Sequence, residues 1–255
     1  QSSMSRFSRV DQDPDWFELV SYLQDLENLP SVQAIRARAL EIIVSVGPRR
    51  GLDLGSGLGS FSAQLSRLSP SLRMTGVDLS DRMVTFASAS VPSADFIQGD
   101  ACEIPLPAGS VDVCYAERLF IHLVRPEDCL SEVERVLGRG GLFVSVETDW
   151  AAADLQSVDA GFAAEFISDY IRHIRQPSAP HAVSTACESR GMELVAWQGF
   201  RMGGGSFEEA DTVVRFENAL RRANPGVDVD GSLSTLRRGF RSFSLPGLLQ
   251  VWKKS

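Results

Sequence analysis

Residues 52–61 read Leu-Asp-Leu-Gly-Ser-Gly-Leu-Gly-Ser-Phe, and this stretch decides the fold. An apolar strand pattern runs into three glycines at alternate positions, and helical spacing follows them. Glycine reaches backbone angles that other residues avoid, and it lets a ligand lie against bare peptide. Open α/β sheets bind ligands at the carboxyl ends of their strands, which is where Asp53 and the glycines lie. The stretch therefore predicts the first strand, turn and helix of a ligand-binding α/β domain.

Strand and helix patterns alternate after this turn. Ser80 is a predicted helix N-cap and Gly138 a predicted C-cap. The pattern predicts helices over 59–69, 80–90, 126–137 and 178–190, and strands over 50–54, 74–78, 95–98, 111–116, 141–147, 193–198 and 248–252. This alternation predicts an α/β fold with a doubly wound, mostly parallel sheet of seven strands.

Two further regions do not alternate. Apolar residues at helical spacing over 15–27 and 31–46 predict an N-terminal helical cap, residues 1–46, ahead of a core domain over 47–255. In the last third we expect a long helix over 153–175, then helices over 207–223 and 232–242, which a turn at 224–226 separates. These later helices form a predicted insertion, residues 206–245, before the last strand.

Composition narrows the possible partners. The 255 residues carry a net charge of −8, which argues against nucleic acid, because phosphate binding needs a basic surface. No apolar run is long enough to span a membrane, and no secretory signal opens the chain. The four cysteines have no metal-ligand spacing, so we expect no metal site. A cytoplasmic protein with reduced thiols, monomeric or homodimeric, is the resulting expectation.

The spacing of the turn is Asp-x-Gly-x-Gly-x-Gly, and Ser60 occupies the third glycine position of a dinucleotide fingerprint. Further motifs follow in register. Asp78 ends the second strand, Gly99-Asp100-Ala101 follows the third, and Glu117-Arg118-Leu119-Phe120-Ile121-His122-Leu123 leaves the fourth. An acidic residue at the end of the second strand can accept hydrogen bonds from both hydroxyls of a ribose. Together, over roughly residues 45–150, these motifs resemble those of the class I S-adenosylmethionine (SAM) dependent methyltransferases.

The resemblance implies SAM as cofactor and S-adenosylhomocysteine as product. It also implies a last strand antiparallel to the sixth, with the insertion packed over the mouth of the active site. Methyl transfer to an O, N or C atom of a small, apolar or aromatic metabolite is the activity we expect, as in natural-product biosynthesis. The predicted cofactor-binding residues are Tyr22, Asp53, Gly55, Ser56, Gly57, Gly59, Asp78, Leu79, Met83, Gly99, Asp100, Ala101, Glu117, Arg118 and His122. Met83 is nearly as well explained as core packing.

The sequence indicates the residues that would contact the acceptor less directly than those that would bind the cofactor. If the acceptor is a hydroxyl or a protonated amine, a base should remove the proton. His122 leads the candidates by position, followed by His181 and Asp149; Glu147 is also considered, and His173 is assigned a structural role. Aromatic residues outside the core motifs could cover an apolar acceptor, although each could instead pack in the core: Trp16, Phe17, Trp150, Phe162 and Phe166.

Two other functions stay open. The chain could bind SAM without transferring its methyl group, as a cyclase or a regulatory protein would. A nicotinamide-dependent oxidoreductase also uses a glycine turn and an acidic residue after the second strand. Ser60 and the Gly99-Asp100-Ala101 motif disfavour the oxidoreductase.

Overall fold

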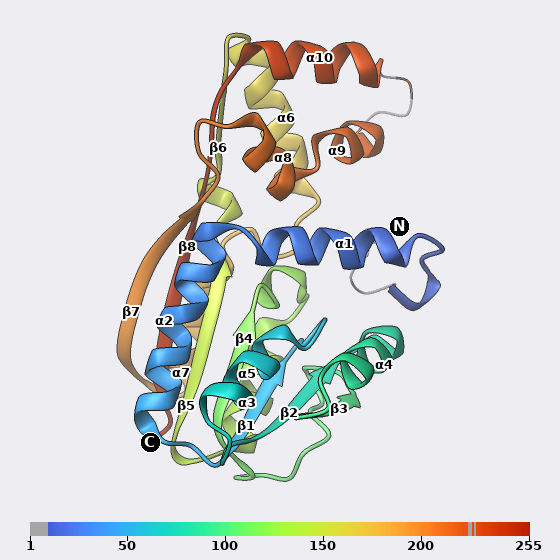
Figure 1. Ribbon diagram of the computed structural model, residues 1–255. Helices are drawn as coiled ribbons and strands as arrows, with labels where there is room; N and C mark the ends of the chain where they lie inside the picture. The colour runs from blue at the N-terminus through green and yellow to red at the C-terminus, as the bar shows by residue number, and fades with distance from the viewer. Residues whose placement is uncertain (1–9, 224–225, 227) are drawn as a thin grey trace.

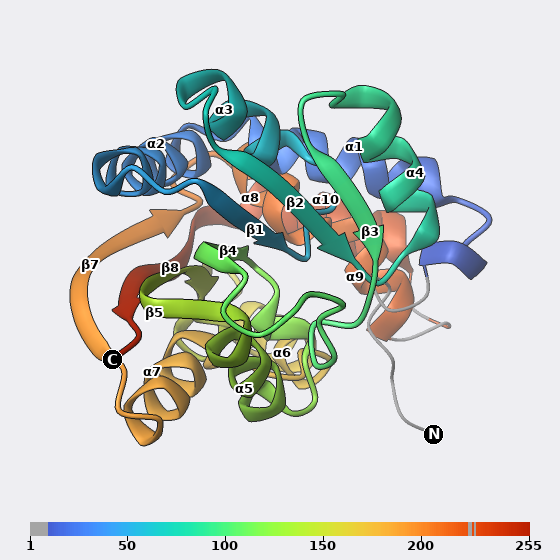
Figure 2. The ribbon, with the colours of Figure 1, turned by 90° about the horizontal axis from the view of Figure 1, so that it is seen from below.

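The computed structural model describes residues 10–223, 226 and 228–255, and a twisted sheet with helices on both faces forms its centre (Figures 1 and 2). The strand order is β3-β2-β1-β4-β5-β8-β6, and β7 also pairs with β8. The strands are β1 Arg50–Leu54, β2 Arg73–Asp78, β3 Asp95–Gln98, β4 Val111–Glu117, β5 Leu137–Thr148, β6 Asp154–Ser157, β7 Glu193–Met202 and β8 Phe240–Lys253. The helices are α1 Trp16–Glu27, α2 Pro30–Val46, α3 Ser60–Leu68, α4 Asp81–Ser90, α5 Pro126–Val136, α6 Ala160–Arg172, α7 Ala179–Ser189, α8 Phe207–Val214, α9 Phe216–Ala223 and α10 Val229–Gly239.

The sheet confirms the doubly wound prediction. Strands β3, β2, β1, β4 and β5 run parallel, whereas β8 is antiparallel to β5 and to β7, as the resemblance implied. Helices α2, α3 and α4 cover one face, and α5 and α7 cover the other (Figure 2). The strand order reverses between β1 and β4, so their carboxyl ends frame the crevice where such sheets bind ligands.

The glycine turn packs closely against β2, and at two glycines there is no room for a side chain. Gly59 caps α3 in the left-handed conformation, with φ of 74°, and a Cβ there would lie 2.7 Å from the ring of Phe96. Gly76 on β2 is equally crowded, because a Cβ would lie 2.9 Å from the Cβ of Ser56. The turn can therefore sit against β2 only with glycine at both positions.

The C-terminal helices form an upper lobe, which we define as β6, α6, α8, α9, α10 and the adjoining first part of β8. In Figure 1 this lobe lies beyond the carboxyl ends of the parallel strands, and α1 lies between it and the core. Its side chains pack in an apolar cluster that they share with Leu26 of α1 and Val32 of α2; the lobe residues of this cluster include Phe166, Phe207 and Phe216. The lobe is therefore a packed body that faces the crevice.

The upper lobe differs from the sequence prediction. The expected helix over 153–175 begins only at Ala160, because Asp154–Ser157 pairs with β8. The helix expected over 207–223 is broken at Arg215, whose φ is 54°, and the amide of Phe216 bonds the Asp211 carboxylate instead. Hydrogen bonding with distant or neighbouring groups overrides helical spacing at both places.

Other boundaries also move. The last strand, β8, is far longer than the predicted strand over 248–252. Because β6 was not predicted, the described residues form a sheet of eight strands rather than seven. Gly138 lies within β5 and does not cap α5, which ends at Val136, whereas Ser80 does cap α4 by accepting the amide of Met83. Asn224 and Pro225 of the expected turn lie outside the described residues.

Within the described ranges, none of the helices combines the length and the apolar character that crossing a bilayer requires. The four cysteines are free thiols, and burial raises the pKa of the Cys102 thiol to about 11. Among these same residues, no set of three or more histidine, cysteine and acidic side chains is placed to hold a metal ion.

Candidate active site

The glycine turn presents bare peptide to a cavity. The amides of Gly55 and Ser56 both donate to the Val77 carbonyl, at 2.8 and 3.1 Å, which pins the turn to β2. Gly57 has φ of 50°, and a Cβ built on it would meet no atom within 4 Å. A ligand could therefore approach the Gly57 backbone closely.

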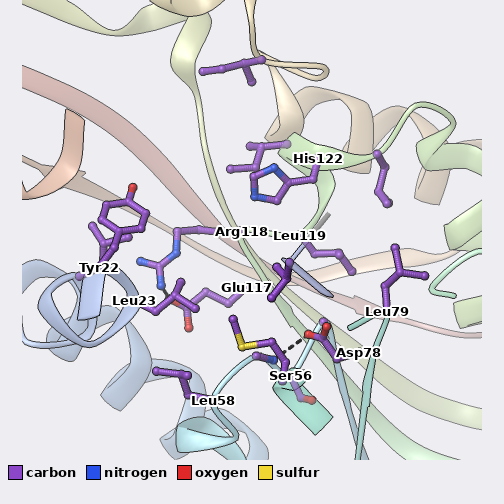
Figure 3. Close-up of a pocket in the computed structure, with 18 of the residues that line it drawn as sticks. Tyr22, Leu23, Ser56, Leu58, Asp78, Leu79, Glu117, Arg118, Leu119 and His122 are labelled. Carbon is purple, nitrogen blue, oxygen red and sulfur yellow. Dashed lines mark hydrogen bonds and ion pairs between the residues drawn. The ribbon is translucent and has the colours of Figure 1, made fainter. Parts of the chain in front are cut away.

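Asp78 is held at the end of β2 by two backbone amides. Its Oδ2 accepts from Gly57 and its Oδ1 from Ser80, each at 2.9 Å. Burial raises the pKa of Asp78, although both amide bonds favour the charged form. A carboxylate offers about four acceptor positions, so two stay available towards the cavity, where Figure 3 places the side chain. This geometry fits a pair of vicinal hydroxyls.

The other two aspartates of the glycine and Gly-Asp-Ala motifs are placed differently. Asp53 is only 4% exposed, and its Oδ2 accepts from the Ser62 hydroxyl at 2.7 Å, which ties β1 to α3. Burial raises the pKa of Asp53 to about 7. Asp100 is exposed, and its Oδ1 accepts the amide of Cys102 at 2.8 Å. Both residues line the cavity, but only Asp78 is braced there by the glycine turn.

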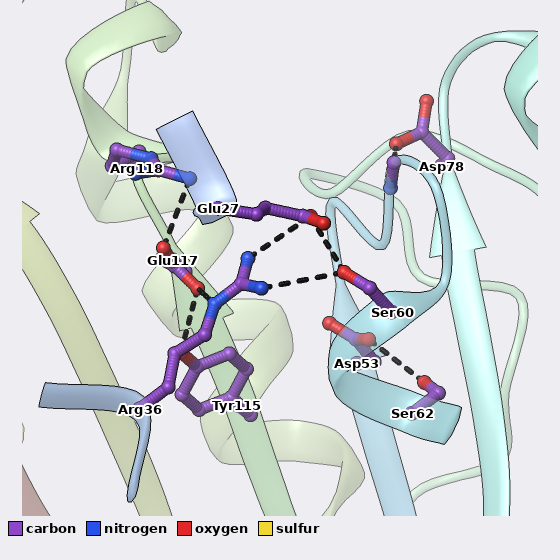
Figure 4. Close-up of polar contacts among 10 residues, drawn as sticks. Glu27, Arg36, Asp53, Ser60, Ser62, Asp78, Tyr115, Glu117 and Arg118 are labelled. Carbon is purple, nitrogen blue, oxygen red and sulfur yellow. Dashed lines mark hydrogen bonds and ion pairs between the residues drawn. The ribbon is translucent and has the colours of Figure 1, made fainter. Parts of the chain in front are cut away.

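A buried ionic network joins the N-terminal helices to the carboxyl end of β4 (Figure 4). Glu117 Oε2 accepts from Arg36 Nε at 2.6 Å and from the Tyr115 hydroxyl at 2.9 Å, and its Oε1 lies 3.0 Å from Arg118. Arg36 also bonds Glu27, whose Oε1 accepts from the Ser60 hydroxyl. Burial acts to raise the pKa of Glu117, but Arg118 and Arg36 hold it below its ordinary value.

Sequence reasoning missed Arg36 and Glu27. The available signal was a charged residue inside the apolar stripe of α2, where Arg36 stands next to Ile35 and at helical spacing from Val32. A charge at such a position is buried only when a partner meets it, which predicts an acidic side chain nearby.

The loop after β4 carries the histidine that the sequence analysis favoured. Arg118 has φ of 51°, an uncommon angle for this residue type, and its amide donates to the Val146 carbonyl. The amides of Leu119 and Phe120 both donate to Glu147 Oε1 at 2.9 Å. These bonds fix the course of the loop, and His122 lies above Arg118 in Figure 3.

His122 is neutral at physiological pH. Burial lowers its pKa to about 4, and the positive charges of Arg118 and Arg175 act in the same direction. A neutral imidazole can accept a proton, so the ring has the form that a general base requires.

One cavity of about 860 Å³ connects these groups. It extends from the glycine turn, under α1, into the upper lobe, where Trp150, Phe166 and Tyr170 line it. The rings of Trp150 and Tyr170 stack with centroids 4.8 Å apart. The cavity thus has a polar end at the sheet and an aromatic end in the lobe.

The structure brings most of the predicted cofactor residues to this cavity. Of that set, only Gly59 is absent from the lining, because it lies behind the turn as the cap of α3. His173 lines the cavity too, so the purely structural role predicted for it from the sequence does not describe its position.

Several acceptor-side predictions fall elsewhere. His181 is exposed in the first turn of α7, and Asp149 forms a backbone bridge with Ser178; neither lines the cavity. Trp150 and Phe166 line it, whereas Trp16, Phe17 and Phe162 do not. Phe17 is 67% exposed, and its ring contacts that of Trp16 in a tilted arrangement on α1, with centroids 4.3 Å apart.

Part of the chain matches a known protein family, and longer stretches are similar to individual proteins. Residues 52–145 match the family described as "Methyltransferase domain". An uncharacterized 37.1 kDa protein in transposon TN4556 of Streptomyces fradiae is 31% identical over 238 residues, covering 91% of this chain and 65% of that protein. The demethylmenaquinone methyltransferase of Thermotoga maritima is 35% identical over 112 residues, covering 44% of this chain and 49% of the enzyme. The chain thus spans about half to two thirds of the length of these relatives.

The fold has solved counterparts too. A geranyl diphosphate methyltransferase in complex with SAM superposes with a TM-score of 0.58 at 14% identity, covering 95% of this chain and 92% of that one. At this identity the likeness concerns the fold alone. Residues 52–145 thus match a methyltransferase domain, and the chain has the Rossmann-like fold of solved methyltransferases.

Proposed function

We propose that the protein transfers the methyl group of SAM to a small molecule with an apolar or aromatic frame. The observation that carries this proposal is the arrangement around Asp78, whose carboxylate is braced by Gly57 and Ser80 beside bare peptide. The same cavity holds a neutral histidine and an aromatic end.

The residues at the sheet end fit SAM. Asp78 would accept from the two ribose hydroxyls, and the Gly57 backbone would lie along the ligand. Leu79 and Met83 offer apolar surface to an adenine ring beside Asp100. The loop at Glu117 and Arg118 would face the methionine part. When bound, SAM supplies a methyl carbon activated by its positively charged sulfur.

The residues at the lobe end would position the acceptor. Tyr22 lies across the cavity, with its hydroxyl donating to the Val213 carbonyl at 3.1 Å, so α1 and the lobe are tied together over the site. Trp150 and Phe166 add apolar walls. Such a cover excludes water and holds the acceptor in line, and alignment of this kind can contribute roughly 7–11 kcal/mol to rate acceleration.

His122 would take the proton from a hydroxyl or amine acceptor. Its ring is neutral at physiological pH and lies between the sheet end and the lobe end of the cavity. An acceptor that loses its own proton to solvent, or an electron-rich carbon, would depend on this residue less.

Isothermal titration calorimetry with SAM and S-adenosylhomocysteine tests the cofactor assignment. We expect Asp78→Ala to abolish measurable binding, because two ribose hydroxyls lose their acceptor. Asp95→Ala is the matched control, since Asp95 is exposed on β3 and does not line the cavity. Unchanged affinity in Asp78→Ala would overturn the ribose assignment.

Transfer itself needs a second measurement. Mass spectrometry should detect S-adenosylhomocysteine and an acceptor heavier by one methylene after incubation with SAM and candidate metabolites. Binding of SAM without either product across a broad acceptor set would favour a protein that uses SAM without transfer. Tight binding of NADH by fluorescence would instead favour an oxidoreductase.

A further inference from the structure

Among the residues that the structure describes, two other than glycine have a left-handed backbone. They are Arg118, with φ of 51°, and Arg215, with φ of 54°. This conformation crowds the Cβ of any residue except glycine, so it persists only where the surrounding contacts hold it. Arg118 belongs to the loop after β4, whereas Arg215 lies in the upper lobe. The contacts of Arg215 therefore indicate what maintains its unfavourable backbone.

Arg215 forms the corner between α8 and α9. Its amide donates to the Asp211 carbonyl at 2.8 Å, which ends α8, and its carbonyl accepts the amide of Ala219 at 2.9 Å. Helices that end in the left-handed conformation usually carry glycine there. Ala219 and its neighbour Asn218 line the cavity. The corner therefore sets where the first turn of α9 meets the cavity.

The side chain of Arg215 reaches from this corner to α1. Its Nη2 lies 2.6 Å from the Asp25 carboxylate, and its Cζ lies over the Tyr22 ring, 5.2 Å from the ring centroid. An arginine can make an ion pair and a contact with an aromatic face at the same time. Glycine could make neither contact, which gives a physical reason for arginine at a position whose backbone favours glycine.

Tyr22 is the part of this arrangement that reaches the cavity. Its hydroxyl donates to the Val213 carbonyl of α8 at 3.1 Å, and Arg118 extends towards it in Figure 3. Burial raises the pKa of the Tyr22 hydroxyl, and the positive charges of Arg118 and Arg215 act against that rise. Tyr22 lines the cavity, whereas Arg215 does not. An effect of Arg215 on a ligand would therefore pass through Tyr22 and α9.

Apolar packing also joins α1 to α8. Leu26 belongs to the same apolar cluster as Val213 and Val214. Such packing is non-directional, whereas an ion pair and a hydrogen bond fix the orientation of the groups that make them. The polar contacts of Arg215 and Tyr22 therefore determine how the two helices are turned towards the cavity.

We propose that Arg215 is a positioning residue for the cofactor site: its contacts with Asp25 and Tyr22 hold α1 against the start of α9, so that Tyr22 closes the cavity over the bound cofactor. This inference rests on the proposed function, because it concerns the ligand of the same cavity. Without these contacts, α1 would separate from α9 more often and the ligand would leave sooner. Two requirements thus oppose each other at this position: the backbone favours glycine, and ligand retention favours arginine.

The first test measures how fast S-adenosylhomocysteine leaves two variants that break the same contacts. Arg215→Gly removes the side chain and relieves the backbone, whereas Asp25→Ala removes the ion pair and keeps the left-handed arginine. Each should raise the dissociation rate constant about three- to tenfold, because an exposed ion pair and a cation–π contact are both modest. Stopped-flow displacement by excess SAM, followed by tryptophan fluorescence, measures the rate, since Trp150 lines the cavity.

Stability and rescue distinguish positioning from a merely structural role. The Tm of both variants should stay within about 4 °C of that of the unmodified protein. Arg215→Lys keeps a positive charge within reach of Asp25 and should keep the dissociation rate constant within about twofold. Glu41→Gln is the matched control, because it breaks an exposed ion pair with Arg38 on α2 and does not line the cavity. Its dissociation rate constant should not change.

Hydrogen–deuterium exchange of the ligand-free protein gives a second readout. Residues 20–27 of α1 and 216–222 of α9 should exchange faster in Arg215→Gly and in Asp25→Ala, while α5 exchanges at its usual rate. Unchanged dissociation in both variants, unchanged exchange in both segments, or faster dissociation only together with a larger fall in Tm would overturn the inference. If the unmodified protein does not bind S-adenosylhomocysteine, the proposed function fails, and exchange in the two segments still decides whether Arg215 positions them.

Discussion

Glu147 offers the sharpest test of how the site is held together. Its side chain is 0% exposed, and its Oε1 accepts the amides of Leu119 and Phe120 that shape the loop before His122. Its Oε2 has no hydrogen-bond partner among the described residues. Burial raises the pKa of Glu147 to about 8, even though the amide bonds act in the opposite direction.

The raised pKa of Glu147 determines how the free energy of unfolding changes with pH, in direction and in magnitude. In the unfolded chain this carboxyl ionises near its ordinary value of 4.5, so between pH 4.5 and about 8 the folded state holds a proton that the unfolded state has released. The contribution to stability is therefore fully present below pH 4.5 and is lost as pH rises to about 8. At 1.36 kcal/mol per pKa unit, the loss amounts to about 5 kcal/mol at most.

Glu147→Gln is the perturbation that isolates this effect. The amide keeps the shape of the protonated acid and still accepts from Leu119 and Phe120, but it cannot ionise. We expect the variant to match the unmodified protein near pH 5 and to exceed its stability by up to about 5 kcal/mol near pH 8–9. Urea unfolding at a series of pH values measures the difference.

Comparison with one control makes the result decisive. Glu188→Gln removes an exposed carboxyl from α7 and should leave the pH dependence of unfolding unchanged. If Glu147→Gln changes stability by the same amount at every pH, the carboxyl does not titrate in this range. The inference that burial dominates its environment would then be refuted.

Three further outcomes are expected. Arg36→Ala should lower the free energy of unfolding by about 3–5 kcal/mol in urea melts, because it leaves the buried Glu117 carboxylate without one of its two arginine partners. His122→Ala should reduce kcat about 100-fold for a hydroxyl acceptor, with S-adenosylhomocysteine affinity preserved in calorimetry; an equal loss of both would make its role structural. Ser80→Ala should cost about 1 kcal/mol, measured by thermal unfolding, because the amide of Met83 loses its cap; an unchanged Tm would contradict a stabilising role for this capping bond.

Local patterns recovered the core accurately. The strand at Arg50–Leu54 and the strand at Asp95–Gln98 have the predicted ends, and α3, α4 and α7 differ from prediction by a residue or so. These elements are bounded by glycines, caps and short turns that act over a few residues. Such signals are present in the sequence itself, without reference to distant groups.

The upper lobe was predicted poorly because its structure depends on distant partners. Leu155 pairs with Phe243, nearly ninety residues later, and no local pattern near Asp154–Ser157 contains that information. Contacts with distant residues also decide which aromatic side chains line the cavity. Phe162 and Phe166 share α6 and both pack in its apolar cluster, yet only Phe166 reaches the cavity.

The amino-acid sequence alone determined the alternation of strands and helices, the glycine turn, and the acidic residue that ends β2, because spacing and backbone chemistry act locally. Only the tertiary structure decided that Arg36 meets Glu117 and that Asp53 turns to Ser62. Helical spacing shows which residues face inward, but it does not show which distant side chain they meet. Charge pairing across the crevice is therefore a property of the folded chain.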